Sequence, residues 1–105
     1  MIEFRRIAGF DWDAGNARKH VATHAVDQAE AEQVFFNDPL LIVDDARHSG
    51  AGARYHALGR TDAGRLVHAT FTLRMEGGRQ DGALIRVISA RDMSRRERVR
   101  YGEEG

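Results

Sequence analysis

Apolar and polar residues alternate most regularly in the middle of the chain. Within residues 65–73, valine, alanine, phenylalanine and leucine occupy every second position, with histidine or threonine between them. Because successive side chains of a strand point to opposite faces, this period of two predicts a half-buried antiparallel strand. Residues 55–60 form a second extended segment, and the Thr-Asp-Ala-Gly sequence between the two ends in Gly64, which tolerates the positive φ of a tight turn. The two segments are therefore predicted to form a β-hairpin.

Further extended segments flank this hairpin. Short apolar runs at 40–43 and 84–90 predict strands, and residues 2–7 are expected to form a short edge strand. The polar segment 44–52 predicts a loop, and the segment 75–82, which contains three glycines, predicts a long hairpin loop. The pattern indicates an antiparallel sheet of about four to five strands, close to the usual sheet size.

Two helices are predicted before the strands of the hairpin. Asp13 is expected to cap a first helix that runs to about Thr23. Asp27, followed by Glu30 three residues later, has the spacing of a capping box and predicts the start of a second helix. That helix should end before Pro39, because the residue preceding a proline is pushed out of the helical region.

A third helix is predicted at the C-terminus. Ser94 and Glu97 again have capping-box spacing, and a helix should follow them. Two helices, a meander of strands and a last helix indicate an α+β fold with the helices packed on one face of the sheet. The length of 105 residues predicts a single domain over 1–105.

Composition and charge narrow the possible functions. The chain has no cysteine, which excludes disulfides, thiolate metal sites and a cysteine nucleophile, and suits a reducing cytoplasm. We find no apolar run long enough for a membrane helix and expect no secretory signal, so a cytoplasmic protein without membrane contact is predicted. The formal net charge is zero, but the segment 91–100 holds five arginines against two acidic residues. Such a basic segment can bind a phosphate chain, or it is simply a solvated helix end.

Four groups of residues, in order along the chain, carry a resemblance to a known family. They are Phe-Asp-Trp-Asp at 10–13 with Gly15-Asn16; Glu-Gln-Val-Phe-Phe-Asn-Asp-Pro-Leu at 32–40; His48-Ser49, Arg54-Tyr55, Leu-Gly-Arg at 58–60 and Gly64-Arg65; and Ile-Arg-Val-Ile-Ser-Ala-Arg at 85–91 with Glu97 and Tyr101. Each group is weakly specific alone, but the ordered set spans nearly the whole chain. The sequence resembles the BrnT family of toxins.

The resemblance implies both a fold and a function. It implies a RelE-like fold and an endoribonuclease, without cofactor, that cleaves RNA and arrests translation. It also implies a BrnA-type antitoxin that neutralises the toxin, a hetero-tetramer of the two proteins, and contact with operator DNA only through the antitoxin.

Cleavage of RNA without a metal needs residues that move protons and residues that bind phosphate. Histidine suits proton transfer because its pKa lies near neutrality, and arginine suits phosphate because its planar fork donates two hydrogen bonds. Tyrosine can stack on a base or donate a proton. The predicted catalytic residues are His24, Arg60, Arg86, Arg91 and Tyr101, and the predicted RNA-binding residues are Lys19, Arg95 and Arg96.

Several of these candidates also have a purely structural interpretation. Arg86 shares a strand face with Leu84 and Ile88, where a charge needs either a carboxylate partner or a functional site. Glu97 is first of all the expected capping partner in the last helix, and Tyr101 can pack that helix on the sheet.

The remaining histidines carry weaker signals. His20 and His24 would share one helix face, but no third ligand accompanies them, so no metal site is predicted. His48, His56 and His68 are scattered along the chain, and the default interpretation of each is a surface histidine.

Two other functions stay open at this level. The family usually has Lys-His-Gly where this chain has Thr23-His24-Ala25, so the alternative is a catalytically weakened homologue that acts mainly as an antitoxin-binding module. Direct DNA binding by this chain alone is less favoured, because no recognition-helix pattern accompanies the C-terminal arginines.

Overall fold

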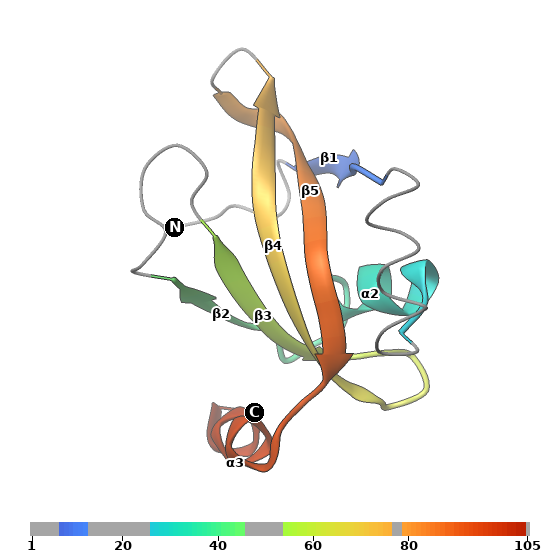
Figure 1. The fold of residues 1–105 in the computed structure, drawn as a ribbon, viewed down its shortest axis with the longest axis vertical. Coiled ribbons are helices and arrows are strands. Elements are labelled where there is room, and N and C mark those ends of the chain that lie inside the picture. Colours follow the sequence, from blue (N-terminus) through green and yellow to red (C-terminus); the bar gives the residue numbers. More distant parts are fainter. Residues whose placement is uncertain (1–6, 13–25, 46–53, 77–78, 105) are drawn as a thin grey trace.

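The computed structural model describes residues 7–12, 26–45, 54–76 and 79–104. Within these ranges the chain forms one five-stranded sheet and two helices (Figure 1). The strands are β1 (Ile7–Phe10), β2 (Leu41–Asp44), β3 (Tyr55–Arg60), β4 (Leu66–Glu76) and β5 (Arg79–Asp92), and the helices are α2 (Gln28–Val34) and α3 (Arg95–Glu104). The predicted α+β class is confirmed. The first predicted helix lies outside the described residues, as do most of the predicted loop at 44–52 and most of the edge strand at 2–7.

The sheet is mixed, whereas an antiparallel sheet was predicted. Its strand order is β1-β5-β4-β3-β2, and the pairs β2–β3, β3–β4 and β4–β5 are antiparallel. The edge strand β1 instead pairs parallel with β5, with Ile7 opposite Ala83 and Phe10 opposite Ile85. The prediction was wrong here because the apolar pattern of a strand indicates which face is buried but not which neighbour it pairs with, or in which direction.

The hairpin of β4 and β5 is longer than predicted. Pairing continues to Glu76 opposite Arg79, so most of the segment 75–82 belongs to the two strands and not to a long loop. The glycines and polar residues there suggested a loop, but ladder hydrogen bonds join backbone groups and do not require apolar side chains. By contrast, the predicted turn between β3 and β4 is confirmed, with Gly64 at φ +89°.

One face of the sheet carries the main core and is covered by α2. Asp27 caps this helix with the predicted capping box, in which the Glu30 amide donates to Asp27 Oδ1 at 2.8 Å. The helix residues Ala31 and Val34 and the adjoining Phe35 pack on the sheet. Their buried sheet partners include Ala57, Val67, Ala69, Phe71, Ile85, Val87 and Ala90.

Gly59 allows α2 to approach β3 closely, and we predict that Gly59→Ala destabilises the fold. A Cβ atom at this position would lie 2.7 Å from Val34 Cγ1 and 3.0 Å from the Val34 carbonyl oxygen. Overpacking of this kind typically costs about 1–3 kcal/mol, so the midpoint of thermal unfolding should fall. Gly102→Ala is the control, since nothing lies within 4 Å of its added Cβ. Equal midpoints for the two variants would contradict the prediction.

The helix α3 packs on the other face of the sheet, so the prediction that the helices share one face was wrong. Leu58 of β3, Met93 and Tyr101 form a separate small cluster on this side. The reason lies in β3, where Ala57 and Leu58 are adjacent, point to opposite faces and are both buried. Figure 1 shows α3 at one end of the sheet, so that it covers only part of this second face. Among the described residues, no helix is long and apolar enough to cross a membrane.

Candidate functional site

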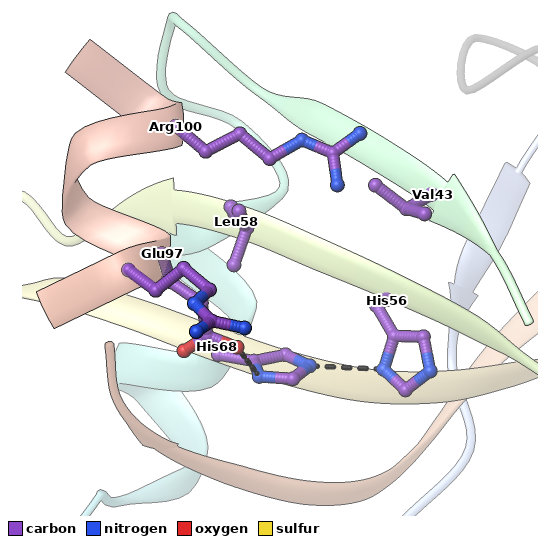
Figure 2. A pocket seen from close by; sticks show the side chains of 7 residues that line it. Val43, His56, Leu58, His68, Glu97 and Arg100 are labelled. Carbon is purple, nitrogen blue, oxygen red and sulfur yellow. Dashed lines mark hydrogen bonds and ion pairs between the residues drawn. The ribbon is translucent and has the colours of Figure 1, made fainter. Parts of the chain in front are cut away.

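A pocket of about 290 Å³ opens where α3 meets the sheet, on the face opposite the main core (Figure 2). Strands β2, β3 and β4 form its floor and the helix forms one wall. The side chains that line it are Val43, His56, Leu58, His68, Arg96, Glu97 and Arg100. Apolar side chains, two imidazoles, one carboxylate and two guanidinium groups therefore meet in one hollow.

His56 and His68 lie in direct contact at the floor of this pocket. His56 Nδ1 is 2.9 Å from His68 Nε2, and the rings meet edge to face (Figure 2). Their contact follows from strand register, because His56 pairs with Thr70 and Leu58 pairs with His68, which makes the two histidines diagonal neighbours on one face. The Thr70 hydroxyl lies 3.1 Å from the same His56 nitrogen.

A carboxylate stands at each outer end of the histidine pair. Asp45 Oδ2, on a side chain only 8% exposed, is 3.2 Å from His56 Nε2. Glu97 Oε2 is 2.8 Å from His68 Nδ1, which is an ion-pair distance without the alignment of a hydrogen bond. The four side chains therefore form a continuous polar chain across the pocket floor.

Glu97 joins this chain to α3 and to β5. It completes the predicted capping box, receiving the Ser94 amide at 2.9 Å. It also accepts two hydrogen bonds from Arg91, at 2.8 Å and 3.0 Å. Burial raises the pKa of Glu97, but the hydrogen bonds from Arg91 and from the Ser94 backbone outweigh it and hold the pKa at about 2. Burial is the larger effect at His68, and it lowers the pKa of that imidazole although Glu97 opposes it.

The low pKa of Glu97 predicts a loss of stability in acid. Its folded-state pKa of about 2 lies below the ordinary 4.5, so the stabilisation is present above pH 4.5 and is lost as pH falls toward 2. That difference corresponds to at most ~3 kcal/mol. Urea unfolding from pH 7 to pH 2.5 should show a steeper acid loss for the wild type than for Glu97→Gln. The exposed Asp44 provides the control variant, Asp44→Asn, and parallel curves for wild type and Glu97→Gln would disprove the prediction.

Of the residues predicted from sequence, Arg96 lines the pocket and Arg91 holds Glu97. Arg86 does not line the pocket. It lies opposite Thr72 on the same sheet face, and its guanidinium is 3.4 Å from the Asp11 carboxylate, which agrees with the expectation that it needs a partner or a site.

The other predicted residues lie away from the histidine pair. Tyr101 is buried in the small cluster under α3, and its hydroxyl donates to the Pro39 carbonyl at 2.6 Å. Arg60 is exposed at the end of β3, and Arg95 is exposed at the start of α3. The predicted residues Lys19 and His24 lie outside the described residues.

The histidine pair was missed by the sequence analysis, which treated His56 and His68 as scattered. The predicted turn at 61–64 did not bring them together, because counting outward from it sets Arg60 opposite Arg65 and places His56 and His68 on opposite faces. In the structure Arg60 pairs with Leu66, and this shift of one residue makes the two histidines diagonal neighbours on one face. The carboxylates Asp45 and Glu97 come from outside the hairpin, and no sequence signal pointed to them.

The arrangement is suited to moving protons next to a bound anion. Imidazoles exchange protons near neutral pH, and guanidinium groups bind phosphate and carboxylate oxygens. In the part of the chain that the structure describes, no group of three or more histidine, cysteine or carboxylate side chains is arranged to hold a metal ion.

A family model described as "Ribonuclease toxin, BrnT, of type II toxin-antitoxin system" matches residues 12–97, which is most of the chain and includes both histidines and Glu97. No curated protein matches the chain.

Proposed function

The chain belongs to the BrnT family of ribonuclease toxins of type II toxin-antitoxin systems, and we propose that it cleaves RNA in the pocket between the sheet and α3. The observation that carries this proposal is the contact of His56 with His68 beside two arginines. Within the described residues, this pocket combines proton-transfer groups with phosphate-binding groups.

The proposed reaction needs no metal ion. The ribose 2′-hydroxyl attacks the neighbouring phosphorus, the O2′–P bond forms and the P–O5′ bond breaks. The histidine pair accepts the proton from O2′ and delivers a proton to O5′, so the products are a 2′,3′-cyclic phosphate and a 5′-hydroxyl. Imidazole is effective in both steps because its pKa lies near the working pH.

The arginines have two separate roles in this proposal. Arg96 and Arg100 line the pocket from α3 and bind the phosphate, whose negative charge increases as the 2′-oxygen attacks. Arg91 acts indirectly, because it holds Glu97, and Glu97 in turn lies against His68. Arg60, Arg86, Arg95 and Tyr101 receive no part in proton transfer, and any contribution of His24 or Lys19 stays a prediction.

Membership of a type II toxin family implies an antitoxin partner. We propose that this partner is of the BrnA type, that two copies of each protein form a hetero-tetramer, and that operator DNA is bound through the antitoxin. The two arginines at the pocket favour an inhibitor with acidic side chains over this region, because charge complementarity directs association.

The proposal is tested with purified protein and a defined RNA in buffer that contains EDTA. We expect cleavage, with 5′ fragments that end in a 2′,3′-cyclic phosphate and 3′ fragments that begin with a 5′-hydroxyl. Cleavage that stops in EDTA and returns with a divalent metal would overturn the metal-free reaction. Fragments with 5′-phosphates would overturn the role given to the 2′-hydroxyl.

The alternative function is an antitoxin-binding module that no longer cleaves RNA. A growth test of cells in which the protein is induced distinguishes it from the ribonuclease. The toxin is expressed alone and then together with the neighbouring gene under a second promoter. Growth arrest that the neighbouring gene relieves, and that His68→Gln abolishes, supports the ribonuclease. Unchanged growth on induction, together with retained binding of the neighbouring gene's product, supports the binding module suggested by Thr23.

A further inference from the structure

The polar chain on the pocket floor has three links, and each link needs a proton. The links join Asp45 to His56 at 3.2 Å, His56 to His68 at 2.9 Å, and His68 to Glu97 at 2.8 Å. An ionised carboxylate and an unprotonated ring nitrogen both present lone pairs, so each of these contacts is attractive only when the ring nitrogen carries a hydrogen. At His68 Nδ1 the contact with Glu97 is an ion pair at 2.8 Å without hydrogen-bond alignment, but a bare nitrogen at that distance would still be repelled by the carboxylate. Two neutral imidazoles carry two N–H groups between them, which is one fewer than the number of links.

Every arrangement of a neutral pair therefore leaves at least one link without a proton. When His56 donates to Asp45 and His68 donates to His56, a bare His68 nitrogen faces the Glu97 carboxylate. When both bonds run the other way, a bare His56 nitrogen faces Asp45. When each histidine donates to its own carboxylate, two bare nitrogens face each other at 2.9 Å. One further proton satisfies all three links at once.

We infer that His56 and His68 form a unit that binds a single shared proton between Asp45 and Glu97, and that Asp45 is a positioning residue for that proton. A second added proton is excluded, because it would set two N–H groups against each other across the 2.9 Å link. The inference rests on the proposed function only where it gives the shared proton a catalytic use.

The charges that face the pair from the surrounding elements agree with one proton. Asp45 follows β2 and Glu97, Arg96 and Arg100 belong to α3. Arg91 of β5 holds Glu97 through two hydrogen bonds, and Asp45 lies 3.2 Å from His56 Nε2, so each imidazole has a carboxylate beside it that favours an added proton. Burial, which lowers the pKa of His68, places the added proton toward His56. The Thr70 hydroxyl accommodates either state, because it can donate to His56 Nδ1 or accept from it.

The shared-proton state then lies between the two proton transfers of the cleavage reaction. In the neutral pair with a bare His56 Nε2, that nitrogen lies on the more exposed of the two side chains (27% against 12%) and accepts the proton from the 2′-hydroxyl, so the pair becomes the singly protonated unit. The same nitrogen then delivers the proton to the leaving 5′-oxygen, which restores the neutral pair. Activity should therefore rise with pH through the midpoint at which the unit loses its proton.

The test is a titration of the full-length protein, with ¹⁵N-labelled histidine and no RNA, followed by NMR from pH 8 to pH 5. His56→Gln and His68→Gln assign the resonances. We expect His56 and His68 to titrate with one common midpoint and to take up one proton together. In Asp45→Asn the amide can donate to a bare His56 nitrogen and stabilise the neutral pair, so the midpoint should fall by about 1 pH unit or more. The pH profile of cleavage should move by the same amount.

Asp44→Asn is the matched control, because it removes one carboxylate from the adjacent, exposed position. Two separate titrations that add up to two protons would overturn the inference, and so would equal shifts in Asp44→Asn and Asp45→Asn. If Asp45→Asn does not fold, the proton count of the wild type decides alone. Because the titration contains no RNA, a protein that fails to cleave can still show the shared proton, which separates this inference from the proposed function.

Discussion

RNA cleavage by the His68→Gln protein should be slower than cleavage by the wild type by a factor of about 10²–10⁴, the usual contribution of a positioned acid-base group. Glutamine has a similar size and its amide can donate to Glu97, but it does not exchange protons near neutral pH. The loss should therefore appear in kcat with little change in KM, because the phosphate-binding arginines are unaffected. The measurement is single-turnover cleavage of a defined RNA at saturating protein.

Arg86→Gln is the comparison variant, because Arg86 was predicted from sequence to be catalytic but lies outside the pocket. Arg86 lies on the same sheet face but pairs with Asp11 and does not line the pocket. Its variant should keep a cleavage rate close to that of the wild type, once the fraction of folded protein is matched by circular dichroism. A His68→Gln protein that cleaves normally beside an inactive Arg86→Gln protein would move the active site to the region of Arg86.

The double variant Arg96→Gln/Arg100→Gln should bind RNA roughly 10- to 100-fold more weakly at low salt, the order expected when two phosphate-binding cations are removed. Both arginines line the pocket from α3, one turn of the helix apart. The salt dependence of binding should also become weaker, because about 0.7 counterions are released for each phosphate neutralised on a single strand. Binding of an RNA that carries 2′-deoxyribose at the cleavage site, measured at several salt concentrations, reports both quantities without turnover.

Arg98→Gln is the control for that measurement. Arg98 lies on the same helix and carries the same charge, but its guanidinium hydrogen-bonds to the Met93 carbonyl and does not line the pocket. Arg98→Gln removes one charge and the double variant removes two. The loss of binding free energy for Arg98→Gln should therefore be less than half of the loss for the double variant. Affinity and salt dependence that fall in proportion to net charge alone would show that α3 acts only through its overall charge.

The β3–β4 hairpin shows how far sequence reasoning reached in this protein. The alternation in residues 65–73 and the glycine at position 64 predicted both strands and the turn between them, and all three are confirmed. The predicted turn did not determine the register, because a turn at 61–64 would set Arg60 opposite Arg65 and put His56 and His68 on opposite faces. The observed pairing of Arg60 with Leu66 places both histidines on one face.

The sheet face on which a residue lies follows from local periodicity, whereas its contact partners are decided by the tertiary structure. Periodicity placed Arg86 in a strand and indicated that it needs a partner, but not that the partner is Asp11, which follows β1 at the parallel edge of the sheet. Likewise, the spacing of Ser94 and Glu97 predicted the helix cap, which is confirmed. It carried no information that the same carboxylate would also reach Arg91 and His68.

The sequence by itself determined the local elements, the α+β class and, through the ordered family resemblance, the kind of protein this is. Helix caps, turns and strand faces depend on residues close together in the chain, so short sequence patterns predict them. The tertiary structure alone decided the parallel pairing of β1, the placement of α2 and α3 on opposite faces, and the convergence of Asp45, His56, His68 and Glu97. These depend on contacts between distant segments, which are selected by packing of the whole sheet, and no local pattern encodes them.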